Sequence, residues 1–114
     1  MKSWSKAIAL ADLNIEIADT FLSRLRGLLG RRDLSEKQAL LLVPCSDVHT
    51  AFMRFSIDVV FINYDGVITK IVHDLRPWRM AVDRTAFASV ELKNGAAHYY
   101  QLEIGQSLLC SNTL

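Results

Sequence analysis

The fold is decided by one stretch, Ile57-Asp58-Val59-Val60-Phe61-Ile62-Asn63-Tyr64-Asp65-Gly66-Val67-Ile68-Thr69-Lys70-Ile71-Val72. Its two apolar runs, 57–62 and 67–72, are rich in β-branched residues, which favour strands. The residues between them end in Asp65-Gly66, and glycine readily takes the positive φ that tight hairpin turns require. The stretch therefore predicts an antiparallel β-hairpin.

Further short strands are predicted on both sides of this hairpin. Apolar and polar residues alternate over 12–17, which is the period of a half-buried strand. The run 39–43 is continuously apolar and is closed by Pro44, which is typical of a buried strand. The remaining predicted strands are 87–92 and 108–110. The segment 96–102 fits either one helical turn or a bulged loop.

One short helix is predicted over residues 21–29. Its apolar residues recur at helical spacing, which gives one amphipathic face. They are Phe21, Leu22, Leu25, Leu28 and Leu29. Asp19 or Thr20 can cap the start of this helix, and Gly30 can end it.

Length and composition indicate a single domain that covers residues 1–114. The chain has 114 residues, of which 51% are hydrophobic, enough for one core but too short for two domains. The predicted strands do not alternate with helices, which argues against a parallel βαβ architecture. We therefore expect a mainly β fold, a compact antiparallel β-sandwich or barrel with one short helix.

The charge balance and the hydropathy pattern exclude some partners. Thirteen basic and 12 acidic residues give a net charge of +1, whereas a dedicated nucleic-acid-binding domain carries a basic excess. We therefore expect no nucleic-acid partner. No apolar run approaches the roughly 18 residues of a membrane-spanning helix, so no transmembrane segment is expected either.

The N-terminal sequence and the cysteines bear on the compartment. The apolar stretch 7–11 has five residues, fewer than the roughly 7–15 of a signal-peptide core. Two cysteines are too few for a disulfide-stabilised secreted scaffold. We expect a cytoplasmic location; an exported form would require that a signal segment had been removed.

The segment 45–58 concentrates chemically active side chains. Cys45 and His49 could act as nucleophile and base, with Asp58 or Asp47 as the orienting carboxylate, because a thiolate is the attacking species and an imidazole lowers its pKa. The surroundings lack the signature of a cysteine-protease family. A buried cysteine beside a hydrogen-bonded histidine explains the same residues without activity, and this interpretation is favoured.

The same segment raises the question of a metal site. Cys45 and His49 are suitable zinc ligands. The residues that could complete a tetrahedral set are His73, His98 and Cys110. These donors occur singly, without a Cys-x-x-Cys or His-Glu-x-x-His motif. We therefore expect no metal site, and the sequence implies no cofactor.

Two carboxylates stand within apolar predicted strands. Asp58 requires a partner if it is buried, and we expect a structural ion pair that fixes the neighbouring loop. The candidate partners are Arg54, Arg76, Arg79 and His49. Glu91, between apolar neighbours, is expected to face solvent or a loop arginine.

The segment Leu75-Arg76-Pro77-Trp78-Arg79-Met80 has two interpretations. Trp78 between two arginines offers an aromatic face with cationic neighbours, which suits an anionic or aromatic ligand. The same tryptophan could instead fill the open end of a β-sandwich, and this plug is slightly favoured. On the first interpretation, the binding residues are His49, Arg54, Asp58, Trp78 and Arg79.

Several spaced motifs, in order, give the chain a family resemblance. They are Arg24-Leu25-Arg26-Gly27-Leu28-Leu29-Gly30-Arg31, Cys45-Ser46-Asp47-Val48-His49-Thr50, Met53-Arg54-Phe55-Ser56-Ile57-Asp58-Val59-Val60-Phe61, Asp65-Gly66-Val67, Pro77-Trp78-Arg79, and Val90-Glu91-Leu92 with Gly95. Over about residues 18–109 the sequence resembles the DUF192 family, small bacterial and archaeal proteins named as a domain of unknown function.

The resemblance implies a compact, mostly antiparallel β-sandwich or barrel with a helix near its start, and it implies no activity. The positions that match the family's signature polar residues are Arg24, His49, Met53, Arg54, Asp58 and Glu91, and none brings a catalytic role. Ser56 stands where the family commonly has proline, and Ala39-Leu40 where a glycine pair or Gly-Met is frequent. These departures bear on local loop geometry rather than on the fold.

Three functional hypotheses follow. The favoured one is a non-catalytic β-sandwich module that binds a small molecule or a protein through the segment 45–58 and the loop 77–79. The second is a thiol-dependent hydrolase or transferase that uses Cys45, His49 and Asp58. The third is a structural accessory protein, a homodimer formed through an exposed sheet edge. The sequence thus leans against an enzyme.

Overall fold

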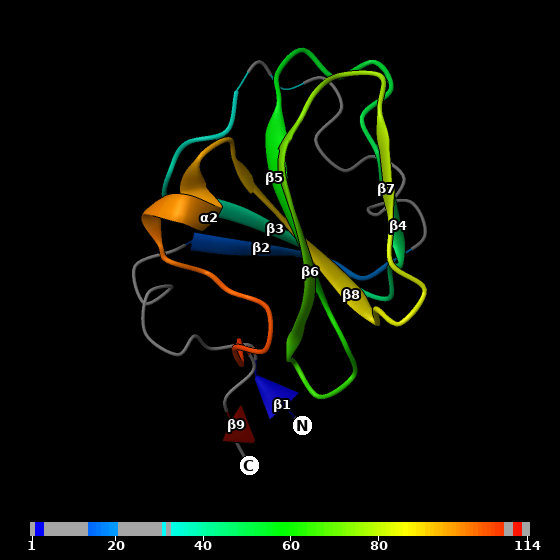
Figure 1. Cartoon of the computed structure of the whole chain (residues 1–114), viewed down its shortest axis with the longest axis vertical. Coiled ribbons are helices and arrows are strands. Elements are labelled where there is room, and N and C mark those ends of the chain that lie inside the picture. The colour runs from blue at the N-terminus through cyan, green and yellow to red at the C-terminus, as the bar shows by residue number, and fades with distance from the viewer. Residues whose placement is uncertain (1, 4–13, 21–30, 32, 109–110, 113–114) are drawn as a thin grey trace.

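The computed structural model describes residues 2–3, 14–20, 31, 33–108 and 111–112, and its regular structure is mainly β (Figure 1). The strands are β1 (Lys2–Ser3), β2 (Asn14–Ala18), β3 (Gln38–Leu42), β4 (Asp47–His49), β5 (Ile57–Ile62), β6 (Ile68–Leu75), β7 (Met80–Val82), β8 (Ala88–Lys93) and β9 (Ser111–Asn112). The described helix is α2 (Ala96–Tyr99), a single turn. The prediction of a mainly β fold with a short helix is confirmed, and no described helix has the length and apolar character needed to cross a bilayer.

Five strands form the main sheet, in the order β2-β3-β8-β5-β6. The pairs β3–β8, β8–β5 and β5–β6 are antiparallel, as predicted, whereas β2 and β3 are parallel, with Asn14 opposite Gln38. Parallel neighbours require a long crossover connection, and residues 19–37 provide it. The helix predicted over 21–29 falls within this connection and outside the described residues.

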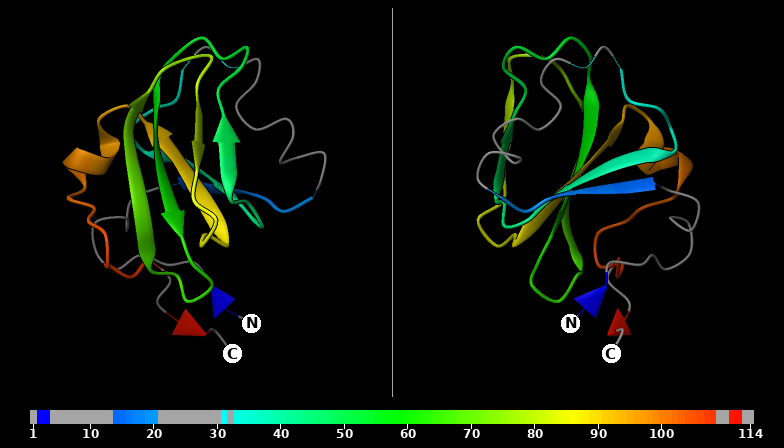
Figure 2. Two further views of the ribbon diagram at one scale, coloured as in Figure 1. Left: turned by 45° about the vertical axis from the view of Figure 1, so that its right-hand side comes forward. Right: turned by 180° about the vertical axis from the view of Figure 1, so that it is seen from behind.

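A second, smaller layer lies against one face of the main sheet. β4 and β7 pair antiparallel, and Figure 2 shows them standing apart from the main sheet rather than extending it. Val48 of β4 and Ala81 of β7 belong to the same buried cluster as Val59 and Phe61 of β5. The two layers form an open sandwich and not a closed barrel. β1 and β9 form a separate two-stranded ladder.

Side chains of β5 alternate between two hydrophobic cores. Val60 and Ile62 contribute to the cluster on the α2 side of the sheet, whereas Ile57, Val59 and Phe61 contribute to the cluster beneath β4 and β7. All six residues of β5 are buried, because the strand lies between β8 and β6 in the sheet and is covered on both faces. This double coverage explains the continuous apolar run in the sequence.

The predicted hairpin is present, with β5 and β6 joined by a turn at 63–67. The amide of Asn63 donates to the carbonyl of Val67 at 2.9 Å, and the Asn63 side-chain oxygen accepts from the amides of Asp65 and Val67. Gly66 has φ 82°, a conformation that glycine adopts without strain. The turn chemistry is therefore the one that the sequence indicates.

The other predicted segments are confirmed in part. The strands predicted at 12–17, 39–43 and 87–92 correspond to β2, β3 and β8. The segment 96–102 begins as one helical turn, α2. Residues 109–110 of the last predicted strand lie outside the described residues, and Ser107 forms an isolated bridge with Val67.

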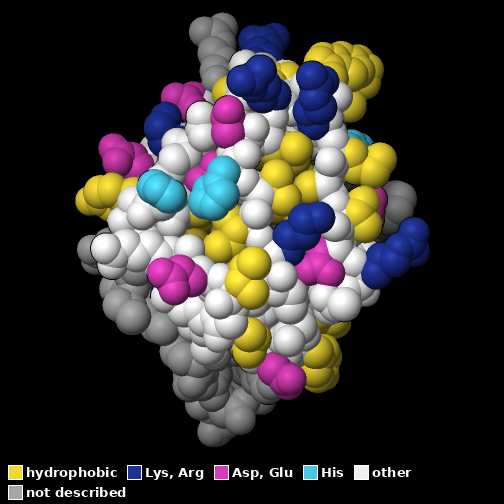
Figure 3. Space-filling view, in the orientation of Figure 1, with side chains coloured by type: hydrophobic (Ala, Val, Ile, Leu, Met, Phe, Trp, Pro, Cys, Tyr) yellow, Lys and Arg dark blue, Asp and Glu magenta, His cyan; other side chains and the backbone are white. Residues whose placement is uncertain are grey.

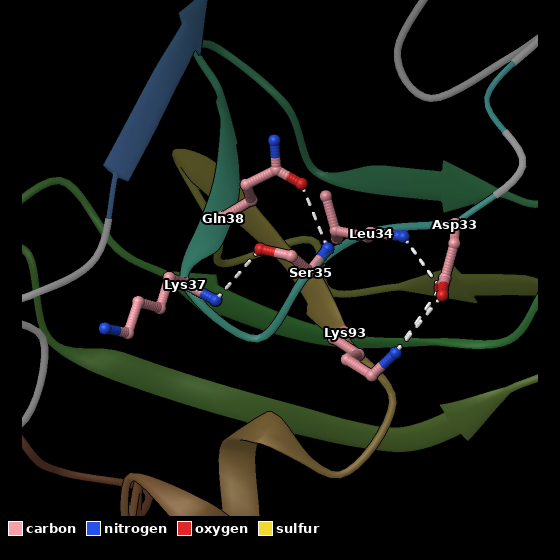
Figure 4. A network of polar contacts seen from close by, with 6 residues as sticks. All are labelled: Asp33, Leu34, Ser35, Lys37, Gln38 and Lys93. Atoms are coloured by element: carbon pink, nitrogen blue, oxygen red, sulfur yellow. Dashed lines mark hydrogen bonds and ion pairs between the residues drawn. The ribbon is translucent and has the colours of Figure 1, made fainter.

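The turn that leads into β3 is tied to the end of β8 (Figure 4). The Asp33 carboxylate accepts from the amide of Leu34 at 2.8 Å and forms an ion pair with Lys93 at 3.4 Å. The amide of Ser35 donates to the side-chain oxygen of Gln38 at 2.9 Å. These contacts fix the start of β3 beside the end of β8.

Candidate functional site

Two loops that are distant in the sequence meet at one end of the molecule. Residues 50–56 connect β4 to β5, and residues 76–79 connect β6 to β7 (Figure 1). β4 and β7 pair with His49 opposite Met80, so both loops leave the same end of this two-stranded layer. The structure thus brings together the two segments that the sequence singled out.

Thr50 connects the two loops from within the fold. Its side chain is fully buried, and its hydroxyl donates to the carbonyl of Arg76 and accepts from the amide of Arg79 at 2.9 Å. Its own amide donates to the carbonyl of Arg79 at 2.9 Å, and its carbonyl accepts from the amide of Trp78 at 3.1 Å. Every polar group of this residue therefore has a partner in the 76–79 loop, which fixes the two loops relative to each other.

The paired loops present two aromatic side chains to solvent. Phe52 has φ 66° and Trp78 has φ 64°, a left-handed conformation that costs a bulky residue about 1 kcal/mol or more. Their ring centroids are 4.6 Å apart, with 59° between the ring planes. Phe52 is 73% exposed and Trp78 is 60% exposed. The plug interpretation of Trp78 is therefore wrong, because the ring lies outside the core.

Arginines accompany the aromatic pair on the same loops. Arg54, Arg76 and Arg79 are all exposed, and Figure 3 shows Lys and Arg side chains gathered beside hydrophobic ones at this end of the molecule. Arg76 Nε lies 3.8 Å from Asp74 Oδ2, so one of these positive charges is partly offset. Met80, at the start of β7, is 63% exposed. We call the surface formed by Phe52, Arg54, Arg76, Trp78, Arg79 and Met80 the loop tip.

The structure does not assemble the catalytic trio considered from the sequence. Cys45 packs against the cluster beneath β4 and β7, whereas His49 is exposed on β4. Asp58 contacts α2 on the opposite face of the main sheet. Among the described residues, no hydrogen bond joins His49 to Cys45 or to Asp58.

The thiol of Cys45 has the environment of a structural cysteine. Its Sγ donates to the carbonyl of Asp47 at 3.0 Å. Burial is the main factor that raises its pKa, and the charges of Glu91 and Asp47 raise it further, while hydrogen bonding with Ser89 and with the backbone of Asp47 opposes the rise. A thiol nucleophile requires the opposite, a lowered pKa.

Asp58 is fully buried and bound by backbone amides. Its Oδ1 accepts from Asp74 at 2.9 Å, and its Oδ2 accepts from Gly95 and Ala97 at 3.0 Å each. The expectation of an arginine or histidine partner is therefore wrong. The carboxylate instead ties β5 to the end of β6 and to the start of α2.

Glu91 is buried, contrary to the expectation from the sequence. It is 5% exposed on β8, with Leu40 and Val59 opposite it on the two neighbouring strands. Burial raises its pKa to about 7, and the positive charge of Arg31 opposes the rise. Of the two alternatives expected for Glu91, solvent is wrong because β8 lies in the middle of the main sheet, whereas the charge of Arg31, outside any strand or helix, does act on it.

Ser89 adds a further polar group beside Cys45 and Glu91. It is fully buried, and its Oγ has no hydrogen-bond partner of good geometry in the part of the chain that the structure describes. Its hydroxyl nevertheless lies close enough to the Cys45 thiol to lower the pKa of that thiol. These three residues form a polar cluster in an otherwise apolar layer. No local sequence pattern indicates the cluster, because its members come together only when β3 pairs with β8.

The metal set considered from the sequence is not assembled either. Within residues 14–20, 31 and 33–108, no group of three or more His, Cys, Asp or Glu side chains is placed to hold a metal ion. His73 and His98 lie together, with ring centroids 5.6 Å apart, but Cys45 and His49 are in other parts of the fold. Cys110 and Arg24 lie outside the described residues.

Asp58→Asn tests the contacts of the buried carboxylate. The substitution keeps the shape of the side chain but turns an NH2 group toward amide donors, so we expect the free energy of unfolding to fall by about 3 kcal/mol in chemical denaturation. Asp65→Asn, at an exposed position of the hairpin turn, is the matched control and should change it by less than about 0.5 kcal/mol. Equal effects of the two substitutions would contradict the role of Asp58.

The pKa of Glu91 predicts a pH dependence of stability. An unfolded chain releases this proton near pH 4.5, whereas the folded protein keeps it to about pH 7. Between these values the folded state binds more protons, so the free energy of unfolding falls as the pH rises, by up to about 3 kcal/mol. Glu91→Gln removes this contribution, so the loss of stability between about pH 5 and pH 8 should shrink. An unchanged loss in the variant would show that Glu91 is not its source.

Glycine substitutions test the backbone at Phe52 and Trp78. Glycine adopts positive φ without strain, whereas alanine does not. We therefore expect Phe52→Gly and Trp78→Gly to be more stable than Phe52→Ala and Trp78→Ala, by about 1 kcal/mol in chemical denaturation. At Met80, within β7, the order should reverse, because glycine destabilises an ordinary strand. The same order at all three positions would contradict the left-handed geometry of the two aromatic residues.

The known proteins that are similar to this chain in sequence have names that state no activity. A model of the DUF192 family, described as Uncharacterized ACR, matches residues 4–110. The UPF0127 protein PF1050 of Pyrococcus furiosus is 30% identical over 102 residues, which are 84% of this chain and 85% of that protein. A UPF0127 protein of Thermococcus sibiricus is 32% identical over 101 residues, which are 82% of this chain and 64% of that protein.

Two solved structures are similar in fold. A protein of unknown function from Novosphingobium aromaticivorans DSM 12444 has a TM-score of 0.76 at 18% identity, over 83% of this chain and 73% of that one. A Sinorhizobium meliloti 1021 protein, described as a proposed transcription regulator, has a TM-score of 0.77 at 22% identity, over 83% of this chain and 79% of that one. At these identities the likeness concerns the fold alone. The family model, in contrast, spans most of the sequence and agrees with the order of the motifs, and on that ground the chain belongs to the DUF192 family.

Proposed function

We propose that this protein is a non-catalytic binding module and that the loop tip recognises an acidic protein partner. The observation that carries the proposal is the exposed Phe52–Trp78 pair, which the two loops hold in a left-handed backbone conformation. Folding alone favours neither the exposure of two large adjacent rings nor this conformation at bulky residues. Strain of this kind persists where an interaction uses it.

The loop tip has the composition of a protein-binding surface. Trp, Arg and Met are enriched at protein interfaces, whereas Lys, Glu and Asp are depleted. Trp78 and Phe52 form the aromatic centre of the loop tip, and Met80 extends its apolar area onto β7. Because Thr50 fixes both loops in advance, little conformational freedom is lost when a partner binds.

The arginines of the loop tip indicate an acidic partner. Arg54, Arg76 and Arg79 contribute three positive charges, and Asp74 is the acidic group that the ion pair places beside them. Guanidinium groups bind carboxylates through two parallel hydrogen bonds and also stack on aromatic rings. A nucleic acid is anionic too, but a net charge of +1 is not the basic excess that a dedicated nucleic-acid-binding domain carries.

A protein partner fits the loop tip better than a small molecule does. Small-molecule sites are concave, with volumes of about 300–1,000 Å³, whereas the rings of the loop tip protrude. A cavity of about 290 Å³ exists at the β2 edge of the sheet, lined by Ile15, Glu16, Arg31, Gln38 and Ala39. Its two charged groups already pair with each other at 2.8 Å. This cavity therefore offers little to an incoming ligand.

Affinity capture with matched variants tests the proposal. The immobilised protein is exposed to an extract of the cells that produce it, and the retained proteins are quantified by mass spectrometry. We expect an acidic protein whose retention falls about tenfold or more when Phe52 and Trp78 are both replaced by alanine. Ile104→Ala is the control, because Ile104 is 67% exposed and lies far from the loop tip. The amide of the next residue, Gly105, donates to the carbonyl of Ile68 at the start of β6, whereas the loop tip follows the end of β6. This control should retain the partner fully.

Charge reversal completes this experiment. Combined Arg54→Glu, Arg76→Glu and Arg79→Glu should abolish retention, and about 0.5 M salt should weaken the wild-type interaction. Calorimetry with the purified partner then measures the change in affinity for each variant. If the partner binds the aromatic and the charge-reversed variants as tightly as the wild-type protein, the loop tip is not the recognition surface.

A further inference from the structure

A feature separate from the loop tip is the pair of histidines His73 and His98. They come from β6 and α2, both are exposed, and their ring centroids are 5.6 Å apart with the ring planes at 89°. Figure 3 shows histidine side chains side by side on this face of the molecule. The chain has three histidines, so only His49, on β4, stands outside this pair.

The buried carboxylate of Asp58 holds the backbone on both sides of the pair. It accepts from the amide of Asp74, the residue after His73, and from the amides of Gly95 and Ala97, just before His98. Both histidines are therefore attached to segments that one charged group fixes. Ligands that are held in place before binding lose little freedom when an ion arrives.

The separation of the two rings matches what one shared metal ion requires. Zn²⁺ binds an imidazole nitrogen at about 2.0–2.1 Å, which places the centre of each ring about 3.2 Å from the ion. At a tetrahedral angle, two such centres are about 5.2 Å apart. The observed spacing of 5.6 Å corresponds to a slightly wider angle of about 120°, within the distortion that zinc accepts because it has no geometric preference from d-electrons.

We propose that His73 and His98 form a binding site for a divalent transition-metal ion of the Zn²⁺, Ni²⁺ and Cu²⁺ class. Imidazole nitrogen suits these ions, whereas Mg²⁺ and Ca²⁺ prefer oxygen ligands. Among the described residues, no third His, Cys, Asp or Glu side chain completes the group. Water or a donor atom of another molecule occupies the other positions, so the ion is exchangeable, unlike the ion of a closed four-ligand structural site.

Zn²⁺ titration of the full chain, purified without a histidine tag and freed of metal by a chelator, tests the proposal. We expect one equivalent to bind at about pH 7.5 in isothermal titration calorimetry, and binding to be lost at about pH 5, because a metal ligand must be deprotonated. His73→Gln and His98→Gln should each weaken binding about tenfold or more, since each removes half of the protein ligands. His49→Gln, the matched control, should change the affinity less than about twofold.

Three results would overturn the proposal. They are no Zn²⁺ binding to the wild-type protein, wild-type affinity in either variant of the pair, and an equal loss in His49→Gln. The substituted side chains are exposed, so all three variants should keep the wild-type circular dichroism spectrum. Zn²⁺ binding should also survive replacement of Phe52 and Trp78 by alanine, because the loop tip contributes no ligand.

Discussion

The arrangement of this fold depends on one buried carboxylate, which pairs with no cationic side chain among the described residues. Asp58 lies in the interior strand β5 and accepts from three backbone amides, one at the end of β6 and two at the start of α2. A buried charge is unfavourable without partners, and hydrogen bonds to a charged group are about twice as strong as neutral ones. The two parts therefore stabilise each other. The carboxylate holds the turn before α2 against the sheet, and the amides of that turn offset the cost of burying the charge. The positions of His73 and His98 follow from the same contacts.

Thr50 performs a similar task at the loop tip with neutral groups. One buried residue supplies two donors and two acceptors to the 76–79 loop, so two segments far apart in sequence behave as one unit. Because the groups are neutral, their burial costs less than that of a carboxylate, but each unmade bond would still leave a buried polar atom without a partner. This explains how the adjacent Phe52 and Trp78 remain in a left-handed conformation. The surrounding hydrogen bonds fix the backbone dihedral angles of the two loops and offset the steric cost of these angles at bulky residues.

The sequence predicted what depends on neighbouring residues and missed what depends on strand order. The hairpin at 57–72 and the buried strand at 39–43 are local patterns of β-branched residues and turn chemistry, and both are present. The burial of Glu91 is not local: alternation with apolar neighbours suits an edge strand as well as a central one, and only pairing with both β3 and β5 removes the solvent. The partners of Asp58 were missed for a related reason, since backbone amides carry no residue signature. The parallel pairing of β2 with β3 likewise depends on a long connection rather than on either strand.

The two faces of the main sheet differ in how well their polar groups are satisfied. On the α2 face, both carboxylate oxygens of the buried Asp58 accept hydrogen bonds from backbone amides. On the other face, beneath β4 and β7, the Ser89 hydroxyl has no hydrogen-bond partner of good geometry among the described residues, and burial raises the pKa of Glu91 to about 7. Above them, the loops of the β4–β7 layer carry two strained, exposed aromatic residues. A sequence shaped by stability alone would favour glycine at the left-handed positions and an apolar residue in place of Glu91. Left-handed residues also occur outside this layer, at Asp74 and Gln101, but Phe52 and Trp78 are the two that are both aromatic and exposed. The unfavourable features of the β4–β7 loops are therefore the ones that the proposed binding role explains.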